Sequence, residues 1–229
     1  MVGIIGAMQL ETRMLKDSIT EKEVRTIGGI EFVSGKLENT DVVVAACGVG
    51  KVFAAMCAQI MILEYHPDAI INTGVGGGVG EGLHIGDIVI GEKLVQHDMD
   101  VCALGCEPGE HMELRRIYFP CAEALVKRIK ASADGLGYPN TLGVIASGDQ
   151  FVSDEDTKMR LRKQFHSLCC EMEGAAVSQV CFVNKVPFVV VRAISDGADG
   201  DAKMSFEDFC RMAAERSSRV LHHMLKEKI

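Results

Sequence analysis

Residues 186–196 read Val-Pro-Phe-Val-Val-Val-Arg-Ala-Ile-Ser-Asp, an apolar run that ends in polar side chains. A run of this length, rich in β-branched residues, predicts a buried strand over residues 186–194. In an open α/β sheet, the ligand site lies outside the carboxyl ends of the strands. The strand would therefore deliver Arg192, Ser195 and Asp196 to such a site.

A second apolar run, residues 167–170, leads into Glu171 and Glu173. Buried ionised carboxylates cost free energy unless they are paired or used in chemistry. Two strands that both end in acids therefore predict a catalytic cleft. The alternative interpretation is that these acids cap the helices that follow each strand.

Short β-branched runs alternate with amphipathic stretches along the rest of the chain, a pattern that predicts βα units. Paired glycines at 28 and 29 predict a hairpin turn, and the irregular residues 97–120 predict a long loop or flap. The expected strands are 2–5, 24–27, 30–34, 42–46, 69–72, 85–90, 142–146, 167–170 and 186–194, and the expected helices are 10–18, 51–65, 121–133 and a last one with an apolar stripe from Phe206 to Leu225.

Composition indicates one folded α/β domain over residues 1–229, because 48% of the residues are hydrophobic and 24% are charged, with no linker-like segment. A net charge of −8 opposes binding to nucleic acid or to anionic membranes, so the expected partner is a small molecule. No stretch approaches the roughly 18 apolar residues of a membrane span, and residues 1–8 lack the basic region of a secretory signal. We therefore expect a cytoplasmic protein.

The nine cysteines form no Cys-x-x-Cys pair and lie mostly in apolar segments, so reduced, buried thiols are the favoured interpretation. Cys102 and Cys106 lie in a polar stretch near His97 and His111, but structural zinc sites show tighter paired spacing. We expect no bound metal.

A glycine cluster at residues 74–80, which includes Gly77, follows the expected strand 69–72. It predicts either a turn where backbone amides approach a ligand closely or tight packing alone. No segment reads GxGxxG, and residues 50–52 fail the P-loop pattern. Nicotinamide, flavin and ATP are therefore disfavoured, and no cofactor is expected.

Seven short motifs, taken together and in order, resemble those of the bacterial 5′-methylthioadenosine/S-adenosylhomocysteine nucleosidases. The resemblance covers nearly the whole chain. This family belongs to the purine nucleoside phosphorylase superfamily, so the resemblance implies a single-domain, three-layer α/β/α fold around a mixed, barrel-like central sheet, and a homodimer. The motifs are Gly-Ala-Met-Gln-Leu-Glu at 6–11, Cys-Gly-Val-Gly-Lys at 47–51, Asn-Thr-Gly at 72–74, Ser-Gly-Asp-Gln-Phe at 147–151, Glu-Met-Glu at 171–173, Arg-Ala-Ile-Ser-Asp at 192–196 and Ser-Phe-Glu-Asp-Phe at 205–209.

The resemblance implies hydrolysis of the N-glycosidic bond of 5′-methylthioadenosine and S-adenosylhomocysteine, and of the related 5′-deoxyadenosine, to adenine and the free sugar. Adenine leaves poorly as an anion, so an acid must protonate it, and Asp196 matches the family's acid at N7. The apolar residues 189–191 before it would raise its pKa by desolvation. Glu11 matches the base that activates water, although a first-turn Glu commonly complements the helix dipole instead.

The same resemblance implies the substrate-binding residues. Glu173 matches the carboxylate that binds the ribose hydroxyls, and Arg192 would hold the water and ribose or pair with Glu173. Phe151 and Phe206 would sandwich adenine while the backbone of Val152 reads its edge. The full set is Met8, Val49, Gly77, Phe151, Val152, Met172, Glu173, Arg192, Ser195 and Phe206.

The chain departs from the family pattern at Val75-Gly76, where many members have Ser-Ala, and over residues 103–120. Sister families cleave nucleosides with phosphate, which requires several cationic donors, whereas only Arg192 stands at a matched position. Hydrolysis is therefore favoured over phosphorolysis. A non-catalytic nucleoside sensor would lack Glu11 or Asp196, and both are present.

Overall fold

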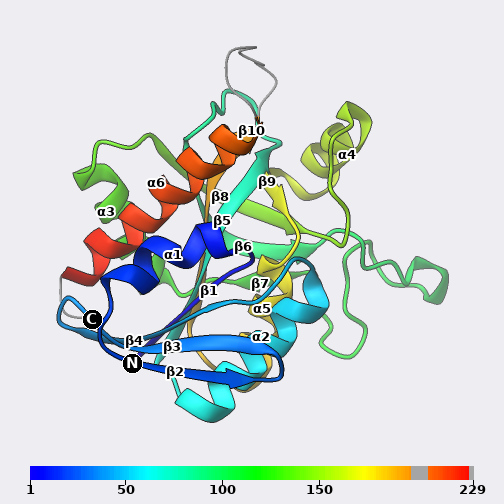
Figure 1. The fold of residues 1–229 in the computed structure, drawn as a ribbon. Coiled ribbons are helices and arrows are strands. Elements are labelled where there is room, and N and C mark those ends of the chain that lie inside the picture. Colours follow the sequence, from blue (N-terminus) through cyan, green and yellow to red (C-terminus); the bar gives the residue numbers. More distant parts are fainter. Residues whose placement is uncertain (197–205, 227–229) are drawn as a thin grey trace.

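Strand β10 (Phe188–Asp196) forms where the sequence predicts it, and it pairs along both edges. It lies parallel to one neighbour and antiparallel to the other, and three further pairings lead from the second neighbour back to the first. These strands close into a mixed ring, which confirms the predicted barrel-like sheet (Figure 1). The ring runs through β5 (Ala69–Gly78), β10, β6 (Ile88–Gln96), β8 (Asn140–Ser147) and β9 (Ser167–Glu171).

The structure is a computed structural model that describes residues 1–196 and 206–226, and of Asp196 and Phe206 it describes the backbone alone. Within these ranges the sheet extends from β5 beyond the ring. Gly28 and Gly29 have φ of 60° and 79°, so the predicted hairpin turn is confirmed. The extension consists of β1 (Val2–Gly6), β4 (Thr40–Ala46), β3 (Ile30–Leu37) and β2 (Thr20–Ile27), and β7 (Tyr118–Pro120) pairs with β6.

Helices cover both faces of the sheet, so the predicted three-layer α/β/α arrangement is confirmed (Figure 1). One apolar core joins the sheet to three helices through residues such as Leu15, Ile129 and Leu221. A second core joins the other face to two helices through Met61 and Val177. The first face carries α1 (Gln9–Ser18), α3 (Glu123–Gly135) and α6 (Phe206–Lys226), the second carries α2 (Lys51–Tyr65) and α5 (Gly174–Asn184), and α4 (Glu155–Phe165) packs on β8 and β9.

Of the two interpretations of the glycine cluster, the turn is wrong and tight packing is confirmed, because residues 74–78 continue β5 as a strand. None of these glycines has a positive φ. Their role is close packing: a Cβ at Gly74 would collide with the Glu11 carboxylate, and a Cβ at Gly76 with the Cys169 sulfur. The absence of side chains thus makes room for an acid beside the strand.

The sequence analysis did not predict α4 and α5, and the reasons for the two omissions are opposite. α5 is buried through most of its first two turns, so it shows no amphipathic stripe. α4 is mostly polar, and only Leu161 and Phe165 are buried. The expected loop at 97–120 also contains a short 3₁₀ helix, Cys102–Leu104, and ends in β7. Among the described residues, no helix is long and apolar enough to cross a membrane.

Candidate active site

A pocket of about 780 Å³, its open mouth included, lies where β1, β5, β8, β9 and β10 end. The pocket brings together nine residues that the sequence analysis assigned to the site. They are Met8, Glu11, Val49, Gly77, Phe151, Val152, Met172, Glu173 and Ser195, and the wall is completed by Ala7, Val75, Gly76, Gln150, Cys170, Glu171 and Cys210.

Glu11 is held by the backbone at the start of α1. Its side chain folds back so that Oε2 accepts the N–H groups of Ala7 and Met8, both at 2.8 Å, and Oε1 accepts the N–H of Val75 at 2.9 Å. The residue is only 3% exposed. Burial raises the pKa of Glu11, while Arg192 and these N–H donors oppose the rise. The carboxylate therefore has a fixed direction and an increased basicity.

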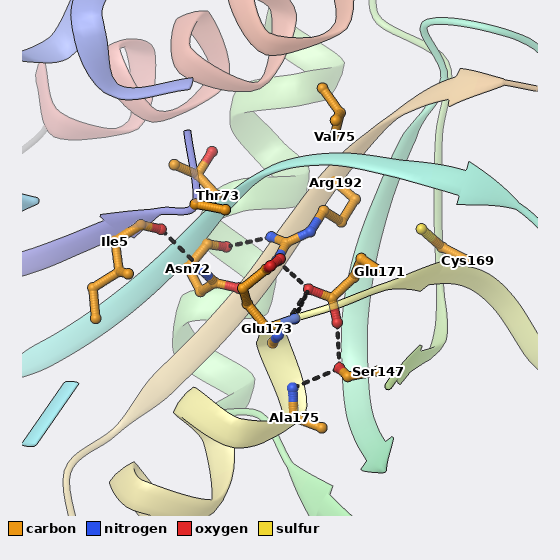
Figure 2. Close-up of polar contacts among 12 residues, drawn as sticks. Ile5, Asn72, Thr73, Val75, Ser147, Cys169, Glu171, Glu173, Ala175 and Arg192 are labelled. Carbon is orange, nitrogen blue, oxygen red and sulfur yellow. Dashed lines mark hydrogen bonds and ion pairs between the residues drawn. The ribbon is translucent and has the colours of Figure 1, made fainter. Parts of the chain in front are cut away.

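Arg192 is fully buried and lies beneath the pocket, not in its wall. Its Nη2 donates to Asn72 Oδ1 at 2.5 Å and forms an ion pair with Glu171. Asn72 in turn donates to the carbonyl of Ile5 at 2.9 Å, and Glu171 accepts from the hydroxyl of Ser147. Figure 2 shows these contacts, which connect β1, β5, β10, β9 and β8 in that order.

Glu173 follows the end of β9 and is the residue that precedes α5. Its Oε1 accepts the N–H of Gly50 at 2.8 Å, and the residue is 6% exposed. Burial, with the nearby negative charge of Glu171, raises the pKa of Glu173 to about 7, against the lowering effect of Arg192. Glu173 thus presents a carboxyl group that ionises near neutral pH.

The structure changes one expected pairing. The sequence analysis allowed Arg192 to pair with Glu173, but its ion pair is with Glu171. Glu171 is the last residue of β9, and its side chain reaches Arg192 of β10 although the two strands do not pair. Glu173 lies beyond the strand and directly precedes α5. The side chains of Asp196 and Phe206, both assigned to the site from the sequence, lie outside the described residues.

Sequence reasoning missed the residues that support the pocket from below. Asn72 and Ser147 belong to the family motifs but received no role, although both are buried polar residues, Asn72 within β5 and Ser147 at the end of β8. A polar residue after an apolar run was the signal that could have found them. The backbone N–H of Val75 donates to Glu11. Val in place of the Ser that many family members have at this position therefore keeps this hydrogen bond.

Breaking the buried ion pair should destabilise the fold. We expect Arg192→Met to lower the free energy of unfolding by about 3 to 5 kcal/mol, because the Glu171 carboxylate, whose side chain is 2% exposed, would be left without its counter-charge. Urea denaturation followed by circular dichroism measures the change. The double variant Arg192→Met, Glu171→Gln is the control and should regain much of the loss, because it removes the unpaired charge and keeps a side-chain oxygen as acceptor for the N–H groups at the start of α5. Equal stability of wild type and single variant would contradict the ion pair.

Comparison with known proteins identifies the family. The profile described as "Phosphorylase superfamily" matches residues 1–226. A 5′-methylthioadenosine/S-adenosylhomocysteine nucleosidase of Shewanella loihica is 41% identical, with 98% of each chain covered. The chain belongs to this nucleosidase family.

Solved structures of the nucleosidase family have the same fold. The enzyme of Neisseria meningitidis, in complex with methylthio-immucillin-A, superposes with a TM-score of 0.93 at 36% identity, with 98% of each chain covered. The Streptococcus pneumoniae nucleosidase with a transition-state inhibitor gives a TM-score of 0.91, again at 36% identity and 98% coverage of each chain. The family and fold predicted from the sequence are therefore confirmed.

Proposed function

We propose that the protein hydrolyses the N-glycosidic bond of 5′-methylthioadenosine and S-adenosylhomocysteine, with 5′-deoxyadenosine as a related substrate, to adenine and the free sugar. Relatives that share at least 36% of its residues over nearly the full chain carry the nucleosidase name. The observation that carries the proposal is the placement of two buried carboxyl groups, Glu11 and Glu173, in one pocket with mostly apolar walls.

Glu11 is the proposed base that takes a proton from the attacking water. The three N–H donors fix its direction, and desolvation raises its pKa, which makes the ionised form a stronger base. The carboxylate lies beside Gly74 and Val75 and forms part of the pocket wall. A water held there would attack the anomeric carbon from one side as adenine leaves from the other.

Glu173 is the proposed ligand of the ribose hydroxyls. As the glycosidic bond breaks, the sugar gains oxocarbenium character and a positive charge. An ionised Glu173 therefore stabilises the transition state more than it stabilises the neutral bound substrate. Because its pKa is raised to about 7 by burial, the ionised form is gained as the pH rises through neutrality. Met172, Met8 and Val49 line the same pocket and supply apolar contact for the sugar and its 5′ substituent.

Asp196 is the proposed acid that protonates adenine N7, because it matches the family's acid and ends the strand that carries Ser195 into the pocket. For adenine itself we propose a sandwich between Phe151 and Phe206, with the backbone of Val152 at the purine edge. Phe151 is 64% exposed at the pocket, so an apolar surface is ready to receive a ring.

Phosphorolysis is the alternative, and the described pocket wall does not favour it. A phosphate dianion requires several cationic or amide donors. No Lys or Arg belongs to the described part of the wall, and the guanidinium of Arg192 is occupied by Asn72 and Glu171. A non-catalytic sensor would bind the nucleoside without releasing adenine, so turnover distinguishes it.

Adenine release should therefore need neither phosphate nor metal. We expect the same rate in phosphate-free buffer, in phosphate and with EDTA, with the free thioribose as sugar product, because Glu11 activates water directly. Chromatography of both products from 5′-methylthioadenosine measures this. A ribose 1-phosphate product whose formation rises with phosphate would establish a phosphorylase, and tight binding without any adenine release would establish a sensor.

We also propose a homodimer. α2 and α5 border a groove with exposed apolar residues, among them Val52 at 78% and Val183 at 57% exposure, and such surface favours contact with a second copy. Sedimentation should give twice the 24.8 kDa chain mass. Val52→Asp should shift the protein toward monomer, whereas Val24→Asp, at an exposed site on β2, should not. A monomeric wild type would contradict the proposal.

A further inference from the structure

The hydroxyl of Ser147 ends the chain of buried contacts beneath the pocket. Ser147 is the last residue of β8, is fully buried, and stands directly beside Glu171 in the register of β9. Its hydroxyl donates to Glu171 Oε1 and accepts the N–H of Ala175 at 2.7 Å (Figure 2). Both hydrogen-bonding functions of the side chain are thus used, and Ser147 itself stands outside the pocket wall.

Ser147 and Glu171 together satisfy the start of α5. Oε2 of Glu171 accepts the N–H groups of Glu173 at 3.0 Å and Gly174 at 2.7 Å, and Ser147 takes the next N–H, that of Ala175. The first N–H groups of a helix have no partner inside the helix. Side chains that accept them determine where the helix begins and how the preceding residue is oriented. Here that residue is Glu173.

We propose that Ser147 is a positioning residue for the ribose-binding carboxylate: by holding Glu171 and the Ala175 N–H, it orients Glu173 toward the substrate. The inference rests on the proposed function. Glu173 has one further anchor, the Gly50 N–H at 2.8 Å from its Oε1. A small rotation of its backbone would break this contact and move the carboxylate relative to the ribose hydroxyls.

The chain offers a matched control in Ser178. It is also fully buried and lies on α5, but its hydroxyl donates to the carbonyl of Gly174 within the helix, at 2.7 Å. Both variants lose a buried hydrogen bond, and Ser147→Ala should lose more stability, because it also leaves the N–H of Ala175 without its acceptor. Only Ser147→Ala should weaken the interaction of Glu173 with the ribose of the substrate.

Kinetics with 5′-methylthioadenosine test the proposal. We expect Ser147→Ala to lower kcat/KM by about tenfold or more while the inhibition constant of free adenine, which has no ribose, changes less than about twofold. Ser178→Ala should stay within about threefold of wild type in both. Wild-type kcat/KM in Ser147→Ala, or an equal loss in Ser178→Ala, would overturn the proposal.

A double-mutant cycle then tests whether Ser147 acts through Glu173. When Ser147→Ala is added to Glu173→Gln, kcat/KM should fall by a further factor of less than about three. The reason is that the carboxylate that Ser147 positions is already absent. If the loss of kcat/KM in the double variant equals the product of the losses in the two single variants, Ser147 has a general structural role and the proposal is overturned. If Ser147→Ala does not fold, Ser147→Cys, with its weaker S–H donor, replaces it in both experiments with the same required outcomes.

These outcomes separate the inference from the proposed function. A wild-type protein that releases no adenine contradicts the proposed function itself. A wild-type protein that releases adenine, together with a Ser147→Ala variant of equal activity, leaves the function standing and contradicts only the positioning role. Circular dichroism melting of each variant measures the stability loss, which should be larger in Ser147→Ala than in Ser178→Ala.

Discussion

Glu11→Gln should lower the rate of adenine release by roughly a hundred- to ten-thousandfold, the usual range for loss of a general base. The amide has nearly the same shape, and its oxygen can still accept N–H groups from Ala7 and Met8, which now reach Oε2. It cannot take a proton from water at neutral pH. Ligand affinity should therefore persist, and steady-state kinetics with calorimetric binding of a non-hydrolysable analogue separates the two.

A matched control for Glu11 is Glu155→Gln. Glu155 is also a first-turn glutamate, on α4, but it is exposed to solvent. If Glu11 only complemented its helix dipole, each variant would be less stable by a few tenths of a kcal/mol to about 1 kcal/mol. Both would then keep full activity. Full activity in Glu11→Gln would return Glu11 to that structural role.

Asp196→Asn should lower adenine release by at least about a hundredfold and leave the fold intact, because an amide cannot protonate the leaving adenine. The measurement is kcat for 5′-methylthioadenosine, with melting temperature as the test of folding. Asp154→Asn provides the control, since Asp154 caps α4 by accepting the N–H of Thr157 at 2.8 Å and stands outside the pocket wall. Near-normal turnover in Asp196→Asn would remove Asp196 from the mechanism.

A substrate with a better leaving group sharpens the test of Asp196. When the leaving group is stable as an anion, its protonation by the enzyme contributes little to the rate. The loss in Asp196→Asn should therefore be much smaller with an activated substrate, such as the p-nitrophenyl O-glycoside of 5-methylthioribose, than with 5′-methylthioadenosine. An equal loss with both substrates would assign Asp196 a role other than acid. Glu11→Gln should be impaired with both, because water attacks in either case.

Local sequence pattern was sufficient for many elements of this fold. The helix Lys51–Tyr65 has the predicted bounds, and the Gly28-Gly29 turn and strand β10 also formed as expected. These elements depend on hydrophobic periodicity and on glycine at positive φ, which neighbouring residues determine. Short motifs were equally informative about the site, since nine of the predicted residues line one pocket.

Tertiary structure decided what lies beneath that pocket. The sequence by itself determined that acids follow two strands, but it did not determine that Arg192 would pair with Glu171 in preference to Glu173. It also did not show that residues 74–78 continue a strand whose missing side chains accommodate Glu11. The first feature arises where two strands of the closed ring face each other, and the second where helix α1 meets strand β5. Buried charges take the partner that this closure places within reach, and spacing along the chain does not encode that distance.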